Sequence, residues 1–190
     1  MKVFFTASHR GKKNFGTYYD IIYKVLADMD FKHLSDTVVS LSTEKYYDIL
    51  DEEGHEGYVK EYSRILNTIR EADVMVFESS YPSLGAGYMI QKSLEMNKPV
   101  LVLYFKGNIP TFLAGIQDEK FQLVEYTEKN LESKIKDAIE KAKSLADKRF
   151  NFFISPSLLT YLNQAAKEQG VTKSTFIRNL INDYRRKLKQ

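Results

Sequence analysis

Short apolar runs alternate with amphipathic segments of helical period along most of this 190-residue chain. The runs typical of strands cover residues 2–8, 36–42, 73–79, 98–105 and 120–126. The segments typical of helices cover residues 18–29, 58–72, 88–97 and 130–148, and residues 51–57 are predicted to be a polar loop. Buried strands that alternate with helices form parallel sheets with helices on both faces. The pattern therefore predicts a doubly wound α/β domain over residues 1–146.

The pattern changes near Asp147, where a second domain, residues 147–190, is predicted to begin. Residues 148–155 predict one short strand, and a helix follows from Pro156 to Gln169. Thr172 is the predicted N-cap of a second helix, whose apolar face is formed by Phe176, Ile177, Leu180, Ile181 and Tyr184. One strand and two amphipathic helices are too few to bury a core alone. We therefore expect this domain to pair with a second copy of itself.

Composition excludes several classes of protein. The chain contains no cysteine, which excludes a disulfide scaffold, thiolate metal sites and thiol catalysis. Its first residues are charged too soon for a signal peptide, and no apolar run reaches the length of about 18 residues that a membrane span needs. His9, His33 and His55 show no metal-ligand spacing. We therefore expect a cytoplasmic protein with no membrane partner, metal or cofactor.

Charge is distributed unevenly along the chain. The net charge is +3, but residues 147–190 carry nine Lys or Arg against three Asp or Glu. The other 146 residues carry 19 basic against 22 acidic side chains. A basic tail on a mildly acidic body predicts an anionic partner for the tail.

The stretch FESSYPSLGAGYMIQKSLE, residues 77–95, leaves a strand, crosses a Ser/Pro/Gly turn and opens a helix. Backbone N–H groups and the helix dipole would meet there, which suits an anion. Gly85 and Gly87 do not complete a dinucleotide-binding fingerprint, because Ile90 stands where the third glycine is required. Two interpretations remain open from the residues alone, a phosphate pocket and a tight strand-to-helix turn.

Residues 72–104, together with VFFTASHRG at residues 3–11, resemble the nucleoside 2-deoxyribosyltransferase family and especially its branch of 2′-deoxynucleoside 5′-phosphate N-hydrolases. The resemblance covers residues 2–126. It implies a nucleotide ligand whose phosphate is held by Ser8, Arg10 and Ser83, groups that suit charge-assisted hydrogen bonding. Phe4 stands where the branch carries a Tyr. The full set of expected ligand-binding residues is Phe4, Ser8, His9, Arg10, Gly11, Ser83, Gly85, Gly87 and Met89.

The resemblance fails at the catalytic positions. The family uses a Glu in a Gly-Tyr-Glu sequence, but this chain has Met89 after Tyr88, and the family's second carboxylate position is Ile65. Cleavage through an oxocarbenium-like transition state needs a carboxylate or a nucleophile, and Met supplies neither. We therefore expect no catalytic residue at these positions, and Glu78 is the one candidate for a displaced acid.

Residues 148–188 resemble a ribbon-helix-helix DNA-binding domain of the CopG/Arc type. The resemblance implies a homodimer or higher homo-oligomer whose paired strands enter the major groove of a palindromic DNA site. Alternation turns Arg149, Asn151 and Phe153 outward. Arg149 suits guanine and Asn151 suits adenine, whereas Phe153 departs from the usual polar reader and suits a thymine methyl or packing on the first domain. The start of the second helix, with Thr172, Lys173 and Ser174, is expected to hold a DNA phosphate.

Two functions remain open at this level. One is a dimeric DNA-binding regulator whose first domain is a catalytically degenerate nucleotide sensor. The other is an active N-glycosidase or deoxyribosyltransferase that uses an unfamiliar acid, with a tail that serves only for dimerisation.

Overall fold

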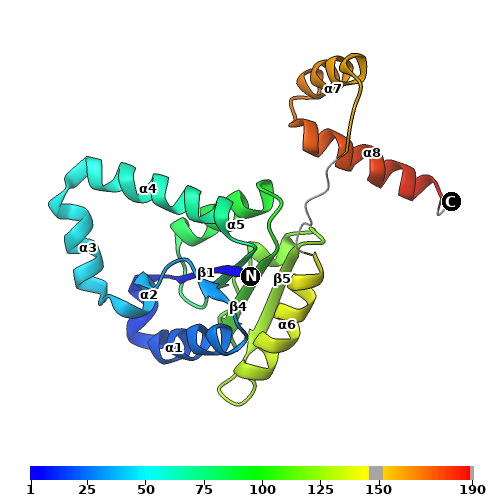
Figure 1. Cartoon of the computed structure of the whole chain (residues 1–190). Coiled ribbons are helices and arrows are strands. Elements are labelled where there is room, and N and C mark those ends of the chain that lie inside the picture. Colours follow the sequence, from blue (N-terminus) through cyan, green and yellow to red (C-terminus); the bar gives the residue numbers. More distant parts are fainter. Residues whose placement is uncertain (146–151, 189–190) are drawn as a thin grey trace. The chain divides into compact units, whose positions relative to one another are not determined.

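Figure 1 shows the computed structural model, in which residues 1–145 and 152–188 are described. The chain divides into two compact units, residues 1–147 and 148–190. The sheet lies in the first unit, and the described part of the second unit contains two helices.

Within the described residues, five parallel strands form one sheet in the order β2-β1-β3-β4-β5. The strands are β1 (Lys2–Ala7), β2 (Lys32–His33), β3 (Val74–Glu78), β4 (Val100–Phe105) and β5 (Phe121–Tyr126). The central strands β3 and β4 are buried along almost their whole length, as expected for strands covered on both faces. The chain passes from β1 to β2 on one side and then returns to β3 on the other. The winding of the sheet therefore reverses at β1.

Helices cover both faces of the sheet, as predicted (Figure 1). Helices α1 (Lys12–Asp28) and α6 (Leu131–Leu145) pack on one face, where Phe5 and Val76 are fully buried. Helices α4 (Gly54–Glu71) and α5 (Leu84–Glu95) pack on the other face, against Phe4, Met75 and Phe77. Alternate residues of each strand thus point into different cores. In the described part of the chain, no helix has both the length and the apolar character that crossing a membrane requires.

The predicted strand at residues 36–42 is wrong. Residues Thr37–Ser40 form a short helix, α2, and the edge position beside β1 is taken by β2. Strand propensity is weak enough for tertiary packing to override it. In the helix, Val38 is buried in the core cluster to which α1 also contributes.

The predicted polar loop at residues 51–57 is also wrong. Helix α3 (Thr43–Glu52) runs almost directly into α4 at Gly54, whose φ of 55° makes the corner. One turn later, a Cβ on Gly57 would lie 2.8 Å from the carbonyl oxygen of Leu50. Two glycines thus let these two charged helices pack closely where a polar sequence suggested a loop.

The second unit contains α7 (Pro156–Glu168) and α8 (Lys173–Lys187), which confirms both predicted helices. Gly170, with a φ of 66°, follows α7. Thr172 caps α8, because its hydroxyl oxygen accepts a hydrogen bond from the Thr175 N–H at 3.2 Å. The predicted strand at 148–155 lies partly outside the described residues, and residues 152–155 form no strand. A strand needs a neighbouring strand for its hydrogen bonds, and this unit of a single chain offers none within the described residues.

Candidate functional site

A pocket of about 620 Å³ lies at the carboxyl ends of β1 and β3. Its walls come from β1 and the loop after it, from α3 and α4, and from the start of α5. Open α/β sheets bind ligands at this place, where the winding reverses, and the volume is typical of small-molecule sites. We call it the charged pocket, because its lining includes Arg10, Asp51, Glu61 and Arg64.

Most of the residues predicted to bind the ligand line this pocket. They are Phe4, Ser8, His9, Arg10, Ser83, Gly85 and Met89. Gly11 does not line it, and a Cβ at Gly11 would lie 2.6 Å from both the Tyr19 hydroxyl oxygen and Tyr81 Cβ. Glycine at this position therefore allows the backbone of Gly11 to pack closely against Tyr19 and Tyr81. Gly87 does not line the charged pocket either, but lines a second pocket against another face of α5.

His9 contributes a neutral ring to the charged pocket. Its imidazole stacks on Tyr46, with 3.8 Å between ring centroids and 5° between planes. Burial, helped by the charge of Lys12, lowers the pKa of His9 to about 4. Its buried Nδ1 has no hydrogen-bond partner among the described residues. At neutral pH, His9 therefore offers a hydrogen-bonding group and no charge.

Arg10 supplies positive charge at this loop. Its side chain is exposed, and its guanidinium carbon lies 5.5 Å from the centroid of the Tyr47 ring. An exposed guanidinium held over a ring keeps its donors available for an anion.

The start of α5 forms the facing wall. Ser83 caps this helix of 12 residues, and its hydroxyl oxygen accepts a hydrogen bond from the Ala86 N–H at 3.2 Å. That bond uses the oxygen as an acceptor and leaves the hydroxyl hydrogen to donate elsewhere. The positive end of the helix dipole lies at the same wall. Arg10, Ser83 and the helix start thus border one pocket, as an anion site requires.

Met89 and Ile65 both line the charged pocket. Both side chains pack against the core cluster that contains Phe4 and Ile90. The two positions at which the family resemblance implies carboxylates are therefore brought together in the fold, and both are apolar.

Glu78 points away from this pocket. Along β3, Phe77 faces the core under α4 and α5, so Glu78 faces the opposite side. There its Oε1 accepts a hydrogen bond from the Tyr126 hydroxyl at 2.9 Å. Burial raises the pKa of Glu78 although Ser80 and Tyr126 donate hydrogen bonds to it. The candidate for a displaced acid is thus absent from the lining of the charged pocket.

Glu61 is a pocket residue that sequence reasoning missed. Its carboxylate accepts two hydrogen bonds from Arg64, at 2.6 Å from Nε and 2.7 Å from the terminal nitrogen. The Tyr46 hydroxyl donates a third at 3.2 Å. Burial alone would raise the pKa of Glu61, but the hydrogen bonds and charge of Arg64 lower it below its usual range. The available signal was spacing, because Glu61 precedes Ile65 by one helical turn and lies on the same face.

The DNA-reading residues predicted in the second unit are only partly described. Arg149 and Asn151 lie outside the described residues, and Phe153 is fully exposed. Lys173 and Ser174 are exposed in the first turn of α8, directly after Thr172. The three residues predicted to hold a DNA phosphate therefore lie together at the exposed start of a helix.

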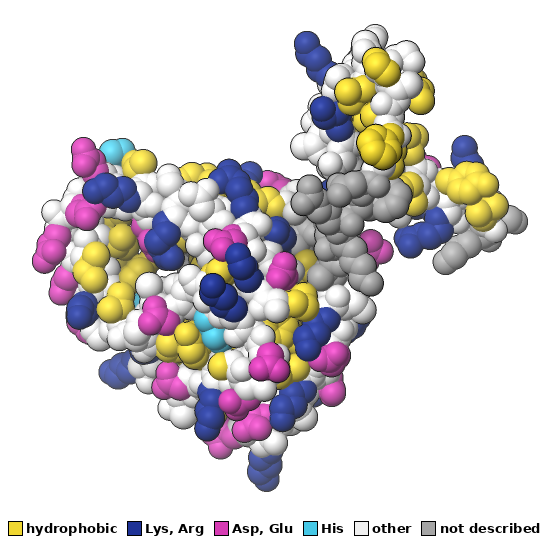
Figure 2. Space-filling view, in the orientation of Figure 1, with side chains coloured by type: hydrophobic (Ala, Val, Ile, Leu, Met, Phe, Trp, Pro, Cys, Tyr) yellow, Lys and Arg dark blue, Asp and Glu magenta, His cyan; other side chains and the backbone are white. Residues whose placement is uncertain are grey.

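The second unit leaves much of its apolar surface exposed. Among the residues that the structure describes, its buried cluster consists of Leu162, Ala165, Ala166 and Phe176. Exposed apolar side chains on α7 and α8 are Leu158, Leu159, Tyr161, Leu180, Ile181 and Tyr184. Figure 2 shows hydrophobic side chains at the surface of this unit, next to Lys and Arg. A contiguous exposed apolar surface usually marks an interaction site.

Comparisons with known proteins found a family model and individual proteins that are similar to parts of this chain. A family model described as "Replication regulatory protein RepB" matches residues 124–183. The 2′-deoxynucleoside 5′-phosphate N-hydrolase 1 of Thermofilum pendens is 30% identical over 152 residues, which cover 76% of this chain and 94% of that protein. The 5-hydroxymethyl-dUMP N-hydrolase of Danio rerio is 28% identical over 149 residues, which cover 74% of this chain and 96% of that protein. A solved structure of a CMP N-glycosidase from Clostridium botulinum matches with a TM-score of 0.46 and 16% identity, over 74% of this chain and 98% of that one.

Proposed function

The chain belongs to the family of the 2′-deoxynucleoside 5′-phosphate N-hydrolases, and from this premise we propose that it is a nucleotide-binding regulator that no longer cleaves its ligand. In this proposal the charged pocket holds a deoxynucleoside monophosphate, and the second unit forms a dimer that binds DNA. The observation that carries the proposal is that Met89 and Ile65 line the same pocket as Arg10 and Ser83.

The proposed phosphate contacts come from two sides of the pocket. Arg10 supplies a charged donor, and Ser8 and Ser83 supply hydroxyl groups beside the start of α5. Charge-assisted hydrogen bonds and a helix N-terminus together favour a phosphate. The names of the relatives include deoxynucleoside 5′-phosphates and dUMP derivatives, which supports a ligand of this class.

The proposed loss of cleavage rests on the absence of a carboxylate at the positions of Met89 and Ile65. A glycosidic bond breaks through a transition state with positive charge on the sugar, which a carboxylate must stabilise or attack. Met89 is an uncharged thioether and Ile65 is aliphatic, so neither does this work. Glu78 faces the other side of the sheet.

Glu61 supports the alternative of an active N-hydrolase, because it is a carboxylate of lowered pKa in the pocket lining. Its charge is already balanced by the two hydrogen bonds from Arg64. A carboxylate held in this way is a weaker nucleophile and a weaker stabiliser of a cation than a free one. The pairing therefore favours binding over cleavage.

An assay for base release decides between these functions. We expect no release above background from a panel of deoxynucleoside monophosphates, together with a rise in melting temperature that Arg10→Ala removes. Turnover that is lost in Glu61→Gln but kept in Glu78→Gln would establish the active enzyme instead. Equal thermal shifts in wild type and Arg10→Ala would contradict the proposed phosphate site.

For the second unit, we propose DNA binding with a regulatory role. The support is its basic composition, its exposed helix start at Lys173 and the match to a replication regulatory model that includes α7 and most of α8. Binding should weaken steeply as salt increases, because phosphate contacts release counterions.

The DNA contacts are tested with two variants of the full chain. Lys173→Ala should weaken binding to all sequences alike and flatten the salt dependence. Arg149→Ala should relax base preference and cost about 1–3 kcal/mol at one position of each half-site. Gel-shift titrations with DNA from the region of its own gene measure both effects. Absence of salt-sensitive binding to any DNA would leave the second unit with dimerisation alone.

A further inference from the structure

Glu78 is a buried carboxyl group that lies outside the charged pocket. It is the last residue of β3 and is only 1% exposed. Its neighbours in the sheet are Ala7 on β1 and Leu103 on β4, which are apolar. Acidic side chains are almost never fully buried unless they are paired. Within the described residues, however, no Lys, Arg or His forms an ion pair with this one, so a structural salt bridge does not explain its position.

The two oxygens of Glu78 have different surroundings. Oε1 accepts hydrogen bonds from the Tyr126 hydroxyl at 2.9 Å, from the Ser80 N–H at 3.3 Å and from the Ser80 hydroxyl. Oε2 is buried, and no described residue donates a hydrogen bond to it. Ionisation spreads negative charge over both oxygens, and a buried charge without a partner is costly. Burial therefore raises the pKa of this carboxyl group, against the opposite effect of its hydrogen bonds.

Tyr19 connects Glu78 to the loop after β1. Its hydroxyl donates a hydrogen bond to the Ser8 carbonyl oxygen at 3.3 Å and also interacts with the Glu78 carboxylate. A tyrosine hydroxyl has one hydrogen to donate, so the two acceptors compete for it. An ionised carboxylate is the stronger acceptor, so ionisation of Glu78 draws this hydrogen away from Ser8. The loop packs closely on this hydroxyl, because a Cβ at Gly11 would lie 2.6 Å from its oxygen.

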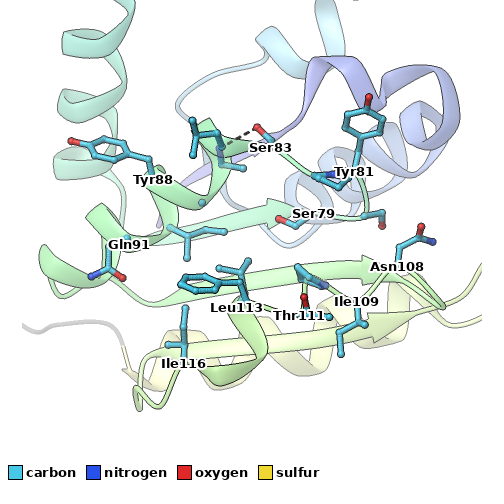
Figure 3. Close-up of a pocket in the computed structure, with 18 residues that line it drawn as sticks. Ser79, Tyr81, Ser83, Tyr88, Gln91, Asn108, Ile109, Thr111, Leu113 and Ile116 are labelled. Carbon is cyan, nitrogen blue, oxygen red and sulfur yellow. Dashed lines mark hydrogen bonds between the residues drawn. The ribbon is translucent and has the colours of Figure 1, made fainter.

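Ser80 connects the same carboxyl group to the loop after β3. Besides its two hydrogen bonds to Glu78, its side-chain oxygen accepts one from the backbone of β4 at 2.6 Å. Figure 3 shows this loop, in which Tyr81 and Ser83 follow on the way from β3 to the start of α5. The two loops that carry the proposed phosphate contacts Ser8 and Ser83 are therefore both connected to Glu78 through hydrogen bonds.

The other titratable groups around Glu78 do not change charge near neutral pH. Tyr19 on α1 and Tyr126 on β5 are the titratable side chains that contact it among the described residues, and burial together with the charge of Glu78 raises the pKa of both. The neighbouring strands and α6 present apolar side chains to this region. His9, on the loop after β1, has a pKa of about 4. Glu78 is therefore the group here that can take up a proton when a ligand binds.

We propose that Glu78 is a positioning residue of the phosphate site and that the site binds its anion when Glu78 is neutral. Neutral Glu78 leaves the Tyr19 hydroxyl bonded to Ser8 and places no negative charge behind the two loops. Ionised Glu78 pulls on both loops and repels a phosphate. Anion binding and proton binding to Glu78 therefore favour each other, and a proton is taken up from solvent when the anion binds. This inference rests on the phosphate site of the proposed function and adds a regulation of its affinity by pH.

Calorimetry on the full chain, with dAMP as the probe at a series of pH values, tests this inference. Glu78→Gln keeps the shape of the side chain and an acceptor oxygen but has no titrating proton. The measured quantity is the ratio of the wild-type Kd to the Kd of Glu78→Gln, in which the titration of the phosphate of dAMP itself cancels. This ratio should rise with pH by up to about tenfold per pH unit, because the neutral fraction of Glu78 falls by that factor once the group is mostly ionised. In buffers of different ionisation enthalpy, the wild type should take up more protons on binding than Glu78→Gln.

Tyr126→Phe is a second test that keeps Glu78 in place. It removes a hydrogen bond that stabilises the ionised carboxylate, so the loss of affinity should begin at a higher pH than in the wild type. Tyr18→Phe is the matched control, because the Tyr18 hydroxyl donates to the exposed Glu128 at 3.0 Å, and its profile should match that of the wild type. This pair keeps the test decisive if Glu78→Gln does not fold.

The possible outcomes separate this inference from the proposed function. A Kd ratio that stays constant with pH, together with equal proton uptake, overturns the positioning role of Glu78 and leaves the phosphate site in place. The same pH profile in Tyr126→Phe and in the wild type also overturns that role. Absence of dAMP binding by the wild type at every pH overturns both the phosphate site and the role of Glu78.

Discussion

The two units of this chain use the same amphipathic pattern with different outcomes. In the first unit, the apolar faces of α1 and α6 pack on a sheet, and Tyr19, Leu26 and Ile139 are completely buried. In the second unit, Ile181 is 62% exposed and Tyr184 is 66% exposed on the apolar face of α8. An apolar stripe is buried only where another element lies opposite. We therefore propose that the first unit is stable by itself, whereas the second unit is stabilised by pairing with a second copy.

Breaking the self-pairing of α8 should give the largest effect. Ile181→Asp removes an apolar side chain from each copy of a symmetric interface, about 1.5–3 kcal/mol per copy. The dimer should weaken by roughly 100-fold or more. Sedimentation over a range of concentrations measures this, with Asn179→Asp as a control that adds the same charge at another exposed position of α8. A wild-type chain that is monomeric at every concentration would remove the basis of the comparison.

A core substitution in the first unit should behave differently. Leu26→Ala creates a cavity at a fully buried position and should lower the free energy of unfolding by about 2–5 kcal/mol. Urea unfolding checks it, and the midpoint of the first unit should be the same at low and high protein concentration. A midpoint that moves with concentration would show that the first unit also depends on a partner.

The stability of the first unit should fall in mild acid. The pKa of His9 is about 4 in the folded chain, against an ordinary value of 6.5. The unfolded chain therefore binds a proton at higher pH than the folded chain, and stability decreases as pH falls from 6.5 toward 4. His9 contributes no pH dependence above that window. Urea unfolding at a series of pH values should show a shallower decline in His9→Gln, and an unchanged decline would assign the effect to other groups.

The two helix caps provide the smallest and most closely matched test. Ser83 caps α5 in the first unit and Thr172 caps α8 in the second, each through its hydroxyl oxygen. Replacement of either residue by Ala should cost about 1 kcal/mol. Ser83→Ala should shift a transition that is independent of concentration, and Thr172→Ala one that depends on it. Identical concentration dependence in the two variants would mean that the units do not differ in this respect.

Local patterns predicted most of the sheet and helices. Strands β3 and β4 are consecutive apolar runs and β1 contains a shorter one, and such runs are buried wherever helices cover both faces. Strand β5 mixes polar and apolar residues and is only partly buried. Strand β2 has no such signal, because it consists of Lys32 and His33 and exists through its pairing with β1. The helical turn at Val38 likewise depends on packing against α1, which no local window of sequence contains.

Motifs predicted the two ends of the charged pocket but not its side wall. Arg10, Ser83 and Met89 lie in stretches that follow two predicted strands of one parallel sheet. The carboxyl ends of such strands lie at the same edge of the sheet, where ligands bind. Glu61 faces the pocket because α3 and α4 cross closely at Gly57, and that crossing was predicted to be a loop. The second pocket, against another face of α5, was missed for a related reason, since segment 108–116 has no periodic pattern that would bring it against α5.

The turn from Pro82 to Ala86 contributes residues to both pockets, namely Pro82, Ser83, Leu84 and Ala86. A molecule that shifts this turn from one side changes the affinity of the other side by some factor. Linkage requires the reverse effect to have the same factor. Titrating a ligand of one pocket in the presence of a ligand of the other pocket therefore measures one coupling free energy. Its value has to be the same whichever ligand is titrated. Its size would report how rigidly four residues at the start of α5 separate two neighbouring sites.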